Sequence, residues 1–110
     1  MGIISSIGDD VQENHSSLLQ SKAGIRKVEH IKTILRDSIM VAEVKHTNDE
    51  LIKKLNLPSD NNFSRTTILG LHAAKEAVAH AGIQDITSCR TGLISATSLG
   101  GMDMTEKYFY

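Results

Sequence analysis

The sequence of 110 residues has little of what marks several classes of protein: one cysteine, one proline, no tryptophan and only 4% aromatic residues. The single cysteine, Cys89, excludes an intramolecular disulfide and favours a reducing compartment. A formal net charge of -1 gives no general attraction to nucleic acid or to anionic membranes. Basic residues interleaved with aromatic ones, as nucleic-acid surfaces use them, are missing as well.

Long hydrophobic runs are also missing. The longest is far shorter than the roughly 20 residues that span a bilayer, and no secretory signal pattern follows Met1. We therefore expect a cytoplasmic chain with neither a membrane nor a nucleic-acid partner. Its length of 110 residues allows at most one domain with a modest core.

The first segment predicts the end of a buried strand at residues 3–4, followed by a turn and a helix. Asp10 is the expected N-cap of this helix, and Glu13 completes an acidic capping box. The helix should stop before Gly24, with two leucines on its buried side, Leu18 and Leu19. A strand usually has about 5 to 6 residues, so we expect that part of this one is missing upstream.

The next segments predict a short strand and a short helix after an irregular or short-helical connection at residues 25–38. Residues 39–45, which are rich in β-branched side chains, fit a strand. Thr47 and Glu50 form a capping box for a helix that Pro58 should end. Three apolar residues share one side of that helix: Leu51, Ile52 and Leu55.

The strongest periodic element is a helix that Ser64 should begin and Gly82 should end. Its apolar positions have helical spacing: Ile68, Leu71, Val78 and Ala81. Small residues occupy much of the rest of its circumference: Gly70, Ala73, Ala74, Ala77 and Ala81. We therefore expect a central helix that is covered on several sides.

Residues 91–97 form an apolar run without alternation, which is typical of a parallel strand buried on both faces. Strands and helices that alternate in this way predict an α/β layer with right-handed crossovers. Residues 104–110 predict a helix that has only just begun, so we expect the chain to be truncated at both ends.

The sequence SLGG at residues 98–101, between an expected strand and a helix, invites comparison with a phosphate-binding loop. Neither GxGxxG nor GxxxxGK[ST] is present, and Asp103 puts a negative charge where a phosphate would need a positive one. We favour the alternative that Gly100 and Gly101 allow close backbone approach or a positive φ.

Other chemistry-bearing residues give no motif. Cys89, at the expected start of a strand, has Arg90 as its one evident activating neighbour, so a half-buried hydrophobic role is favoured over a nucleophile. Five histidines show no metal-ligand spacing and are interpreted as surface or satisfied core residues: His15, His30, His46, His72 and His80.

Three segments in fixed order, GIISSIGDDV, SRTTILGLHAAKEAVAHAGI and RTGLISATSLGGMD, resemble the N-terminal part of the β-ketoacyl-acyl-carrier-protein synthases, members of the thiolase-like superfamily. The first is similar to that family's opening strand and turn. The second is similar to its long central helix, and the third to the next strand with a glycine-rich loop beside the acyl pocket. The sequence departs from the family's pattern in two places. The opening strand is shortened, and SRTT replaces an acidic residue that is often found before the central helix. The second departure leaves the subfamily open.

The resemblance implies an incomplete thiolase-like α/β layer, a partial mixed sheet with a buried central helix, over residues 1–110. It implies an acyltransferase that performs a decarboxylating Claisen condensation in fatty-acid or polyketide-type synthesis, with an acyl carrier protein as partner and no metal or cofactor. The family's catalytic cysteine and two histidines lie in later segments, so we expect this chain alone to be inactive. Cys89 aligns with a strand and not with the nucleophile.

The resemblance also places the substrate-binding residues. Leu99 would stand at the wall of the acyl pocket, Gly100 and Gly101 would shape the loop, and Ser98 would lie nearby. The alternative is a small interaction or scaffold domain derived from the family. Either way, unpaired strand edges predict a homo-oligomer.

Overall fold

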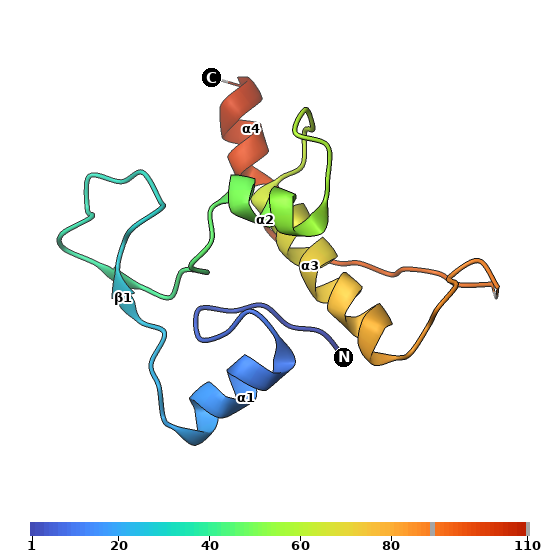
Figure 1. Ribbon diagram of the computed structural model, residues 1–110. Helices are drawn as coiled ribbons and strands as arrows, with labels where there is room; N and C mark the ends of the chain where they lie inside the picture. The colour runs from blue at the N-terminus through green and yellow to red at the C-terminus, as the bar shows by residue number, and fades with distance from the viewer. Residues whose placement is uncertain (89, 110) are drawn as a thin grey trace.

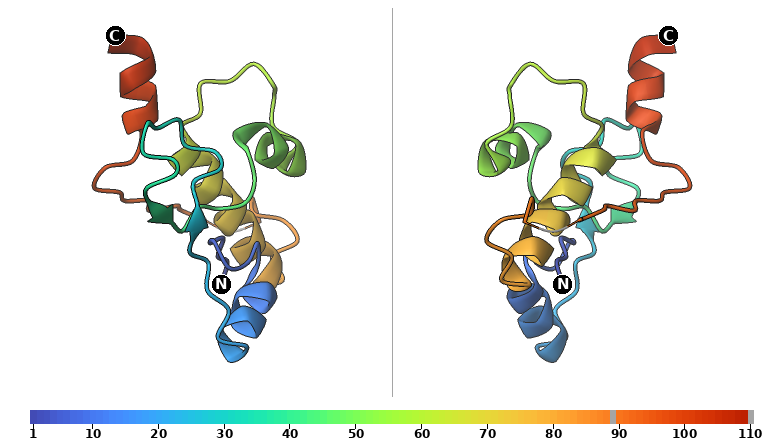
Figure 2. Two further views of the ribbon diagram at one scale, coloured as in Figure 1. Left: turned by 90° about the vertical axis from the view of Figure 1, so that its left-hand side faces the viewer. Right: turned by 90° about the vertical axis from the view of Figure 1, so that its right-hand side faces the viewer.

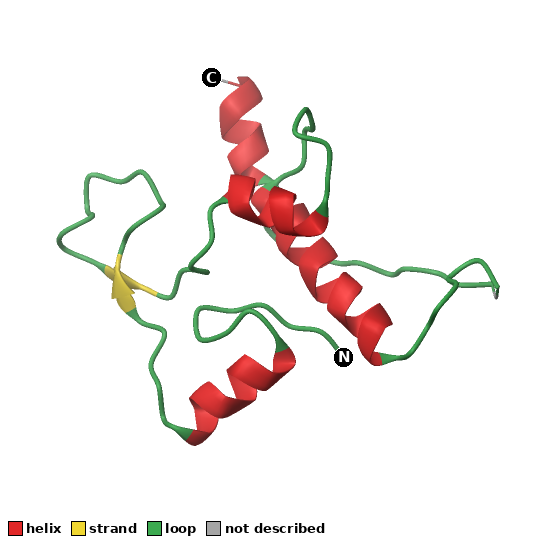
Figure 3. Cartoon of the chain, in the orientation of Figure 1, coloured by secondary structure: helices red, strands yellow, loops and turns green. Residues whose placement is uncertain are grey.

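The longest helix, α3 (Arg65–His80), runs through the middle of the molecule, and the other elements are arranged around it (Figures 1 and 3). The computed structural model describes residues 1–88 and 90–109. Within these residues it is a mixed α/β structure of four helices and one two-stranded sheet. The other elements are α1 (Val11–Leu19), β1 (Arg26–Lys27), β2 (Met40–Val41), α2 (Asn48–Leu55) and α4 (Met102–Phe109).

The predicted starts of α2 and α3 and the predicted end of α3 are confirmed. The Ser64 side chain accepts a hydrogen bond from the Thr67 amide, and Gly82, just past α3, has φ +69°. Thr47 and Glu50 form both halves of a capping box at α2. The end of α2 differs from the prediction, because Asn56 adopts the left-handed conformation (φ 57°) and stops the helix before Pro58.

Helix α1 begins at the predicted cap, where the Asp10 side chain accepts from the amide of Glu13. The prediction that Leu18 and Leu19 face the interior is wrong, because both are exposed. The buried side of α1 is polar instead. Asn14 donates to the carbonyls of Gly8 (2.9 Å) and Asp10 (2.8 Å) and accepts from the Ser5 hydroxyl, while Ser17 donates to the Ile7 carbonyl (2.7 Å). The helix thus holds the preceding turn.

The sheet consists of β1 and β2, which pair antiparallel with Arg26 opposite Val41 and Lys27 opposite Met40. The expected strand at residues 39–45 therefore exists only over Met40–Val41, and β1 lies in the connection that the sequence predicted as irregular. Beyond β2, the buried Glu43 carboxylate accepts hydrogen bonds from three successive amides, those of Glu29, His30 and Ile31. Burial works to raise the pKa of Glu43, but these amide hydrogen bonds outweigh it and lower the pKa.

Two of the predicted strands are not strands in the described residues. Residues 91–97 cross the side of α3 as an extended loop, and residues 3–4 are equally without strand pairing. A strand needs a neighbour that completes its backbone hydrogen bonds. The Ile3 amide donates instead to the side chain of Glu76. The parallel layer expected from the sequence is therefore not formed by these residues.

The prediction that the central helix is covered on several sides is also wrong for this chain, because in α3 only Ile68 is fully buried. Among the described residues, the buried hydrophobic core consists of Val28, Leu51 and Ile68. Helix α2 packs against α3 and brings Leu51 into this core. Helix α4 projects away from the rest of the molecule, at the end opposite α1 (Figure 2).

The molecule exposes more surface than a folded monomer of its size. Its accessible surface is 8529 Å², whereas a folded 12.0 kDa monomer would expose about 6,000 Å². Its radius of gyration is 15.9 Å, against about 13 Å for a compact domain of this length. Large apolar side chains along residues 93–109 contribute to the excess: Leu93, Ile94, Leu99, Met102, Tyr108 and Phe109. The described residues therefore leave a large apolar surface uncovered.

Candidate functional site

A cavity of about 790 Å³ lies between the first residues of the chain, one face of α3 and the extended segment after it. The N-terminal segment supplies residues 2–4, α3 and its cap supply residues from Ser64 to Ala74, and the last segment supplies residues 93–97 and Gly100. The lining contains hydroxyl groups and apolar side chains but no charged residue. A neutral or hydrocarbon group fits such a lining better than a phosphate does.

The geometry favours glycine at both positions 100 and 101 of the SLGG loop, for a different reason at each. A Cβ added to Gly100 would lie 2.6 Å from the Thr97 side chain and 2.8 Å from that of Thr66 in α3, so a side chain at this position would require these threonines to move. Gly101 has φ +93°, which side chains rarely adopt. The favoured interpretation, close approach and a positive φ, is confirmed for these two positions.

The acidic residue after the loop, Asp103, contacts the N-terminus of α3. The Asp103 carboxylate accepts a hydrogen bond of 2.9 Å from the amide of Arg65, the first residue of α3. A negative charge is favourable at a helix N-terminus. The start of α4 is therefore fixed to the start of α3 by an internal carboxylate.

The four predicted substrate-binding residues lie together in the turn before α4, but they do not all face the cavity. Gly100 lines it and donates its amide to the Thr97 hydroxyl at 3.0 Å. Ser98, Leu99 and Gly101 are not among its lining residues, and Leu99 is 76% exposed. The described residues thus bring one of the four to the cavity and leave Leu99 free to contact a group outside it.

The N-terminal wall of the cavity is held by Glu76 of α3. Its two carboxylate oxygens accept from the amides of Ile3 and Val11, each at 2.8 Å. These two amides lower the pKa of Glu76. The terminal ammonium of Met1 lies 3.1 Å from His80 Nδ1 at the end of the same helix. One acidic side chain therefore fixes the segment before α1 to α3.

A second polar cluster joins the turn before α1 to α2. Asp9 accepts from His46 and, at 2.9 Å, from the Lys54 ammonium. Burial works to raise the pKa of Asp9, but the hydrogen bonds and charges of Lys54 and His46 outweigh it, so the pKa lies below its ordinary value. His46 also faces the Glu50 carboxylate at 3.7 Å. His46 is thus a structural partner of two carboxylates.

Arg65 connects the start of α3 to the segment that leads into α2. Its guanidinium donates to the Asn48 side chain at 2.8 Å and to the carbonyls of Val44 (3.1 Å) and His46 (3.0 Å). The roles of Arg65, Glu43 and Glu76 were not predicted from the sequence, because each side chain binds distant backbone groups that no local motif marks. A charged residue within a mostly small or apolar segment, such as Glu76, is the one signal that could have indicated its role.

Nucleophilic and metal chemistry has little support in the described part of the chain. Cys89 lies outside it, so neither interpretation of that residue is tested. Within residues 1–88 and 90–109, no group of three or more His, Cys, Asp and Glu side chains is placed to hold a metal ion. The same residues contain no helix that is long and apolar enough to cross a membrane.

Comparison with known proteins gives relatives of one kind. The chain is 33% identical to the 3-oxoacyl-[acyl-carrier-protein] synthase 2 of Staphylococcus aureus strains N315 and Mu50, and 32% identical to that of strain COL. Each alignment covers 96% of this chain but 26% of the relative, so the chain spans about a quarter of the length of these proteins. No family model matches the chain, and no solved structure matches it significantly. The predicted resemblance to the β-ketoacyl-acyl-carrier-protein synthases is thus confirmed in sequence, and this chain is related to a segment of those enzymes.

Proposed function

We propose that this chain acts as the N-terminal part of a β-ketoacyl-acyl-carrier-protein synthase. The observation that carries the proposal is the alignment with 3-oxoacyl-[acyl-carrier-protein] synthase 2 over 96% of the chain. The uncharged cavity beside Gly100 supports it, because the acyl chain of such a substrate is a hydrocarbon. The acyl carrier protein named in the relatives is the proposed partner of the assembled enzyme.

The proposed reaction is a decarboxylating condensation. An acyl group passes from its carrier thioester to an enzyme cysteine, and the carrier thiol is released. A malonyl thioester then loses CO₂, its α-carbon forms a bond to the acyl carbon, and the enzyme thiol leaves. In the proposed assembly the cysteine and two histidines come from segments that this chain does not contain. This chain supplies binding surface and no catalytic residue.

Within that assembly, we assign the loop Ser98, Leu99, Gly100 and Gly101 to the border of the acyl pocket. The loop backbone supports this assignment. The close approach at Gly100 and the positive φ of Gly101 restrict the backbone conformation next to Leu99, and so restrict the direction in which its side chain leaves the loop. The exposed Leu99 side chain is available to a pocket wall that further polypeptide would complete. In a thiolase-like layer, residues 1–4 and 91–97 would gain the strand neighbours that they lack here.

The first test is the activity of the chain alone. Incubated with acyl and malonyl carrier-protein thioesters, the 110-residue chain should give no condensation product and no acylated Cys89 by mass spectrometry. The matched control is the complete S. aureus synthase, which should form product under the same conditions. A measurable rate for the chain alone, or a stable acyl adduct at Cys89, would overturn the assignment of catalysis to other segments.

The second candidate function is a small interaction or scaffold domain derived from the same family. The observation that favours it is the uncovered apolar surface of a chain with 8529 Å² accessible. A stable pair of proteins buries about 800 Å² on each partner, which is well below the excess. Either candidate predicts self-association, so light scattering at micromolar concentration should give at least twice the monomer mass. A single monomeric species would count against an interaction role for this surface.

A further inference from the structure

Residues 1–20, which we refer to as the N-terminal unit, are held together by hydrogen bonds among themselves. The Ser5 amide donates to the Gly8 carbonyl at 2.8 Å and closes the turn before α1. The Ser17 hydroxyl of α1 donates to the Ile7 carbonyl in that turn at 2.7 Å. The turn and the helix therefore fix each other without the help of other segments.

The N-terminal unit contributes nothing to the hydrophobic core. Within residues 1–20, all of which the structure describes, no apolar side chain is buried, and Leu18 and Leu19 of α1 are exposed. In Figure 1 the first residues of the chain run between α1 and α3. Hydrophobic stabilisation scales with the apolar area that is removed from water. It therefore contributes little to the attachment of the unit.

Two carboxylates supply polar contacts that attach the unit instead. Glu76 of α3 accepts from the amides of Ile3 and Val11, one on each side of the turn, each at 2.8 Å. Asp9 in the turn accepts from the Lys54 ammonium of α2 at 2.9 Å. Contacts of this kind at a protein surface stabilise only modestly, because water competes for each partner. We therefore expect the attachment to open while the core stays folded.

The N-terminal unit also closes one side of the uncharged cavity. Residues 2–4 line that cavity together with α3 and residues 93–97. The contact with α3 is tight at Gly2, because an added Cβ would overlap the carbonyl oxygen of Ala73 and lie 2.8 Å from the amide nitrogen of Ala77. If the unit moves away from α3, the cavity loses this wall and opens to water.

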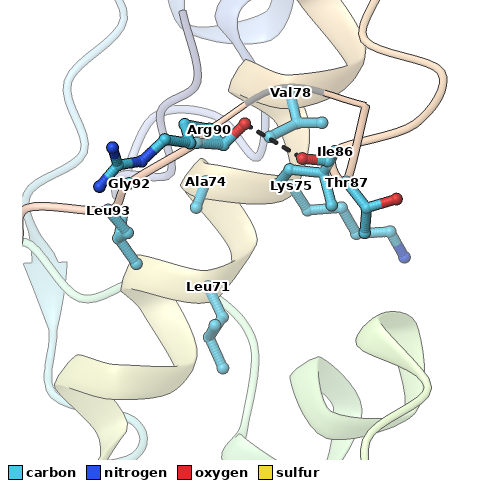
Figure 4. A pocket seen from close by; sticks show the side chains of 10 residues that line it. Leu71, Ala74, Lys75, Val78, Ile86, Thr87, Arg90, Gly92 and Leu93 are labelled. Carbon is cyan, nitrogen blue, oxygen red and sulfur yellow. Dashed lines mark hydrogen bonds between the residues drawn. The ribbon is translucent and has the colours of Figure 1, made fainter.

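The same helix borders a second hollow that the unit does not line. Residues 86–93 fold back beside α3 there, next to the side chains of Leu71, Ala74 and Val78 (Figure 4). None of residues 1–20 is among its lining residues. Movement of the unit should therefore expose the uncharged cavity and leave the hollow beside Val78 unchanged.

We propose that the N-terminal unit is a strap that opens and closes the uncharged cavity, and that Glu76 holds it closed. The unit keeps its turn and α1 when it opens, and it moves about residues 21–25, which form neither helix nor strand. The packing of α2 against α3 stays in place. The proposal concerns access to the cavity, whatever enters it, so it does not rest on the proposed function.

Amide hydrogen exchange of the 110-residue chain, followed by NMR, tests the opening. In Glu76→Gln one acceptor remains and the other becomes a donor, so protection of the Ile3 and Val11 amides should fall about three- to tenfold. The Ser5 amide, which is bonded within the unit, and the Ile68 amide of the core should change less than about twofold.

The matched control for the charge is Glu106→Gln in α4, which should leave the protection of Ile3 and Val11 unchanged. Equal losses of protection at Ile3, Ser5 and Ile68 in Glu76→Gln would overturn the proposal, because the unit would then belong to one cooperative fold with the core.

A steric variant opens the strap while Glu76 is intact. The methyl group of Gly2→Ala would overlap the backbone of α3, so protection of the Ile3 amide should fall at least about fivefold. Gly92→Ala is the matched control, since a Cβ there meets open space. It should leave the exchange of Ile3 unchanged.

A soluble gadolinium chelate then shows whether the cavity opens, because it broadens the NMR signals of groups that water reaches. In Gly2→Ala the methyl signals of Leu69, which lines the uncharged cavity, should broaden more than in the unaltered chain. Those of Val78, beside the second hollow, should not change. Unchanged broadening at Leu69 would overturn the strap, and that result would leave the condensation assays of the proposed function unaffected.

Discussion

Replacing Leu51 with alanine is expected to lower the free energy of unfolding by about 2–5 kcal/mol. Leu51 is 0% exposed and stands where α2 packs against α3. The change removes apolar contacts and leaves a cavity that the neighbouring helices can only partly fill. Because the part of the chain that the structure describes has just two other buried hydrophobic side chains, Val28 and Ile68, few contacts remain to compensate.

The expected loss is a large share of the free energy of unfolding of a folded protein, which is about 5–15 kcal/mol in total. Urea unfolding followed by circular dichroism measures it, because the midpoint shifts while the slope stays fixed. Ile34→Ala is the matched control, since Ile34 is 101% exposed and its truncation should change stability by at most about 0.5 kcal/mol. Equal midpoints for the two variants would contradict this account of the core.

The change Leu99→Phe is expected to shorten the acyl chain that an assembled synthase accepts. The assay needs a chimera in which this chain replaces the segment of S. aureus 3-oxoacyl-[acyl-carrier-protein] synthase 2 that it matches. If Leu99 stands at the pocket wall, the phenylalanine ring occupies space that the distal end of a long acyl chain needs. One methylene changes kcat/KM by roughly 10- to 200-fold in a tight apolar pocket, so the longest substrate should lose at least about tenfold.

Short acyl substrates separate this effect from damage to the fold. They do not reach the enlarged side chain, so their kcat/KM should stay near that of the unaltered chimera. Leu35→Phe makes the same chemical change at an exposed residue outside the loop and should leave the chain-length profile unchanged. A Leu99→Phe chimera with an unaltered profile, or with equal losses for all chain lengths, would remove Leu99 from the pocket wall.

Local signals predicted the helices well because their determinants are short-range. Thr47 with Glu50, Ser64 with Thr67, and Asp10 with Glu13 each form a cap within three residues, and each is present in the structure. The end of α2 was predicted too late in the sequence, because Pro58 is a strong helix breaker and was taken as the stop signal. Asn56 reaches the left-handed conformation first and ends the helix two residues earlier.

The strands were predicted poorly because a strand depends on a partner that may be far away or missing. Residues 91–97 have the apolar run of a buried strand, but no described segment pairs with them. The apolar pattern records what the segment is suited to, whereas backbone pairing requires a second chain segment beside it. The two residues of β1 show the converse, because they pair with β2 despite a weak strand signal.

The backbone features of the candidate site were predicted from the sequence, but the acidic side chains that hold its segments together were not. The glycines at 100 and 101 have the close approach and the positive φ that the sequence suggested. Asp103 and Glu76 act on amides 38 and 65 to 73 residues away, and sequence spacing gives no signal at such distances. Long-range carboxylate-to-amide contacts of this kind emerge only once the chain is folded.

The condensing activity of the unaltered chimera tests the proposed synthase function most directly. If this chain is a functional synthase segment, the chimera should melt cooperatively and form condensation product. The parent enzyme with the matching segment deleted should form none. A chimera that melts cooperatively but forms no more product than the deletion variant would contradict the claim that this chain functions as part of a β-ketoacyl-acyl-carrier-protein synthase.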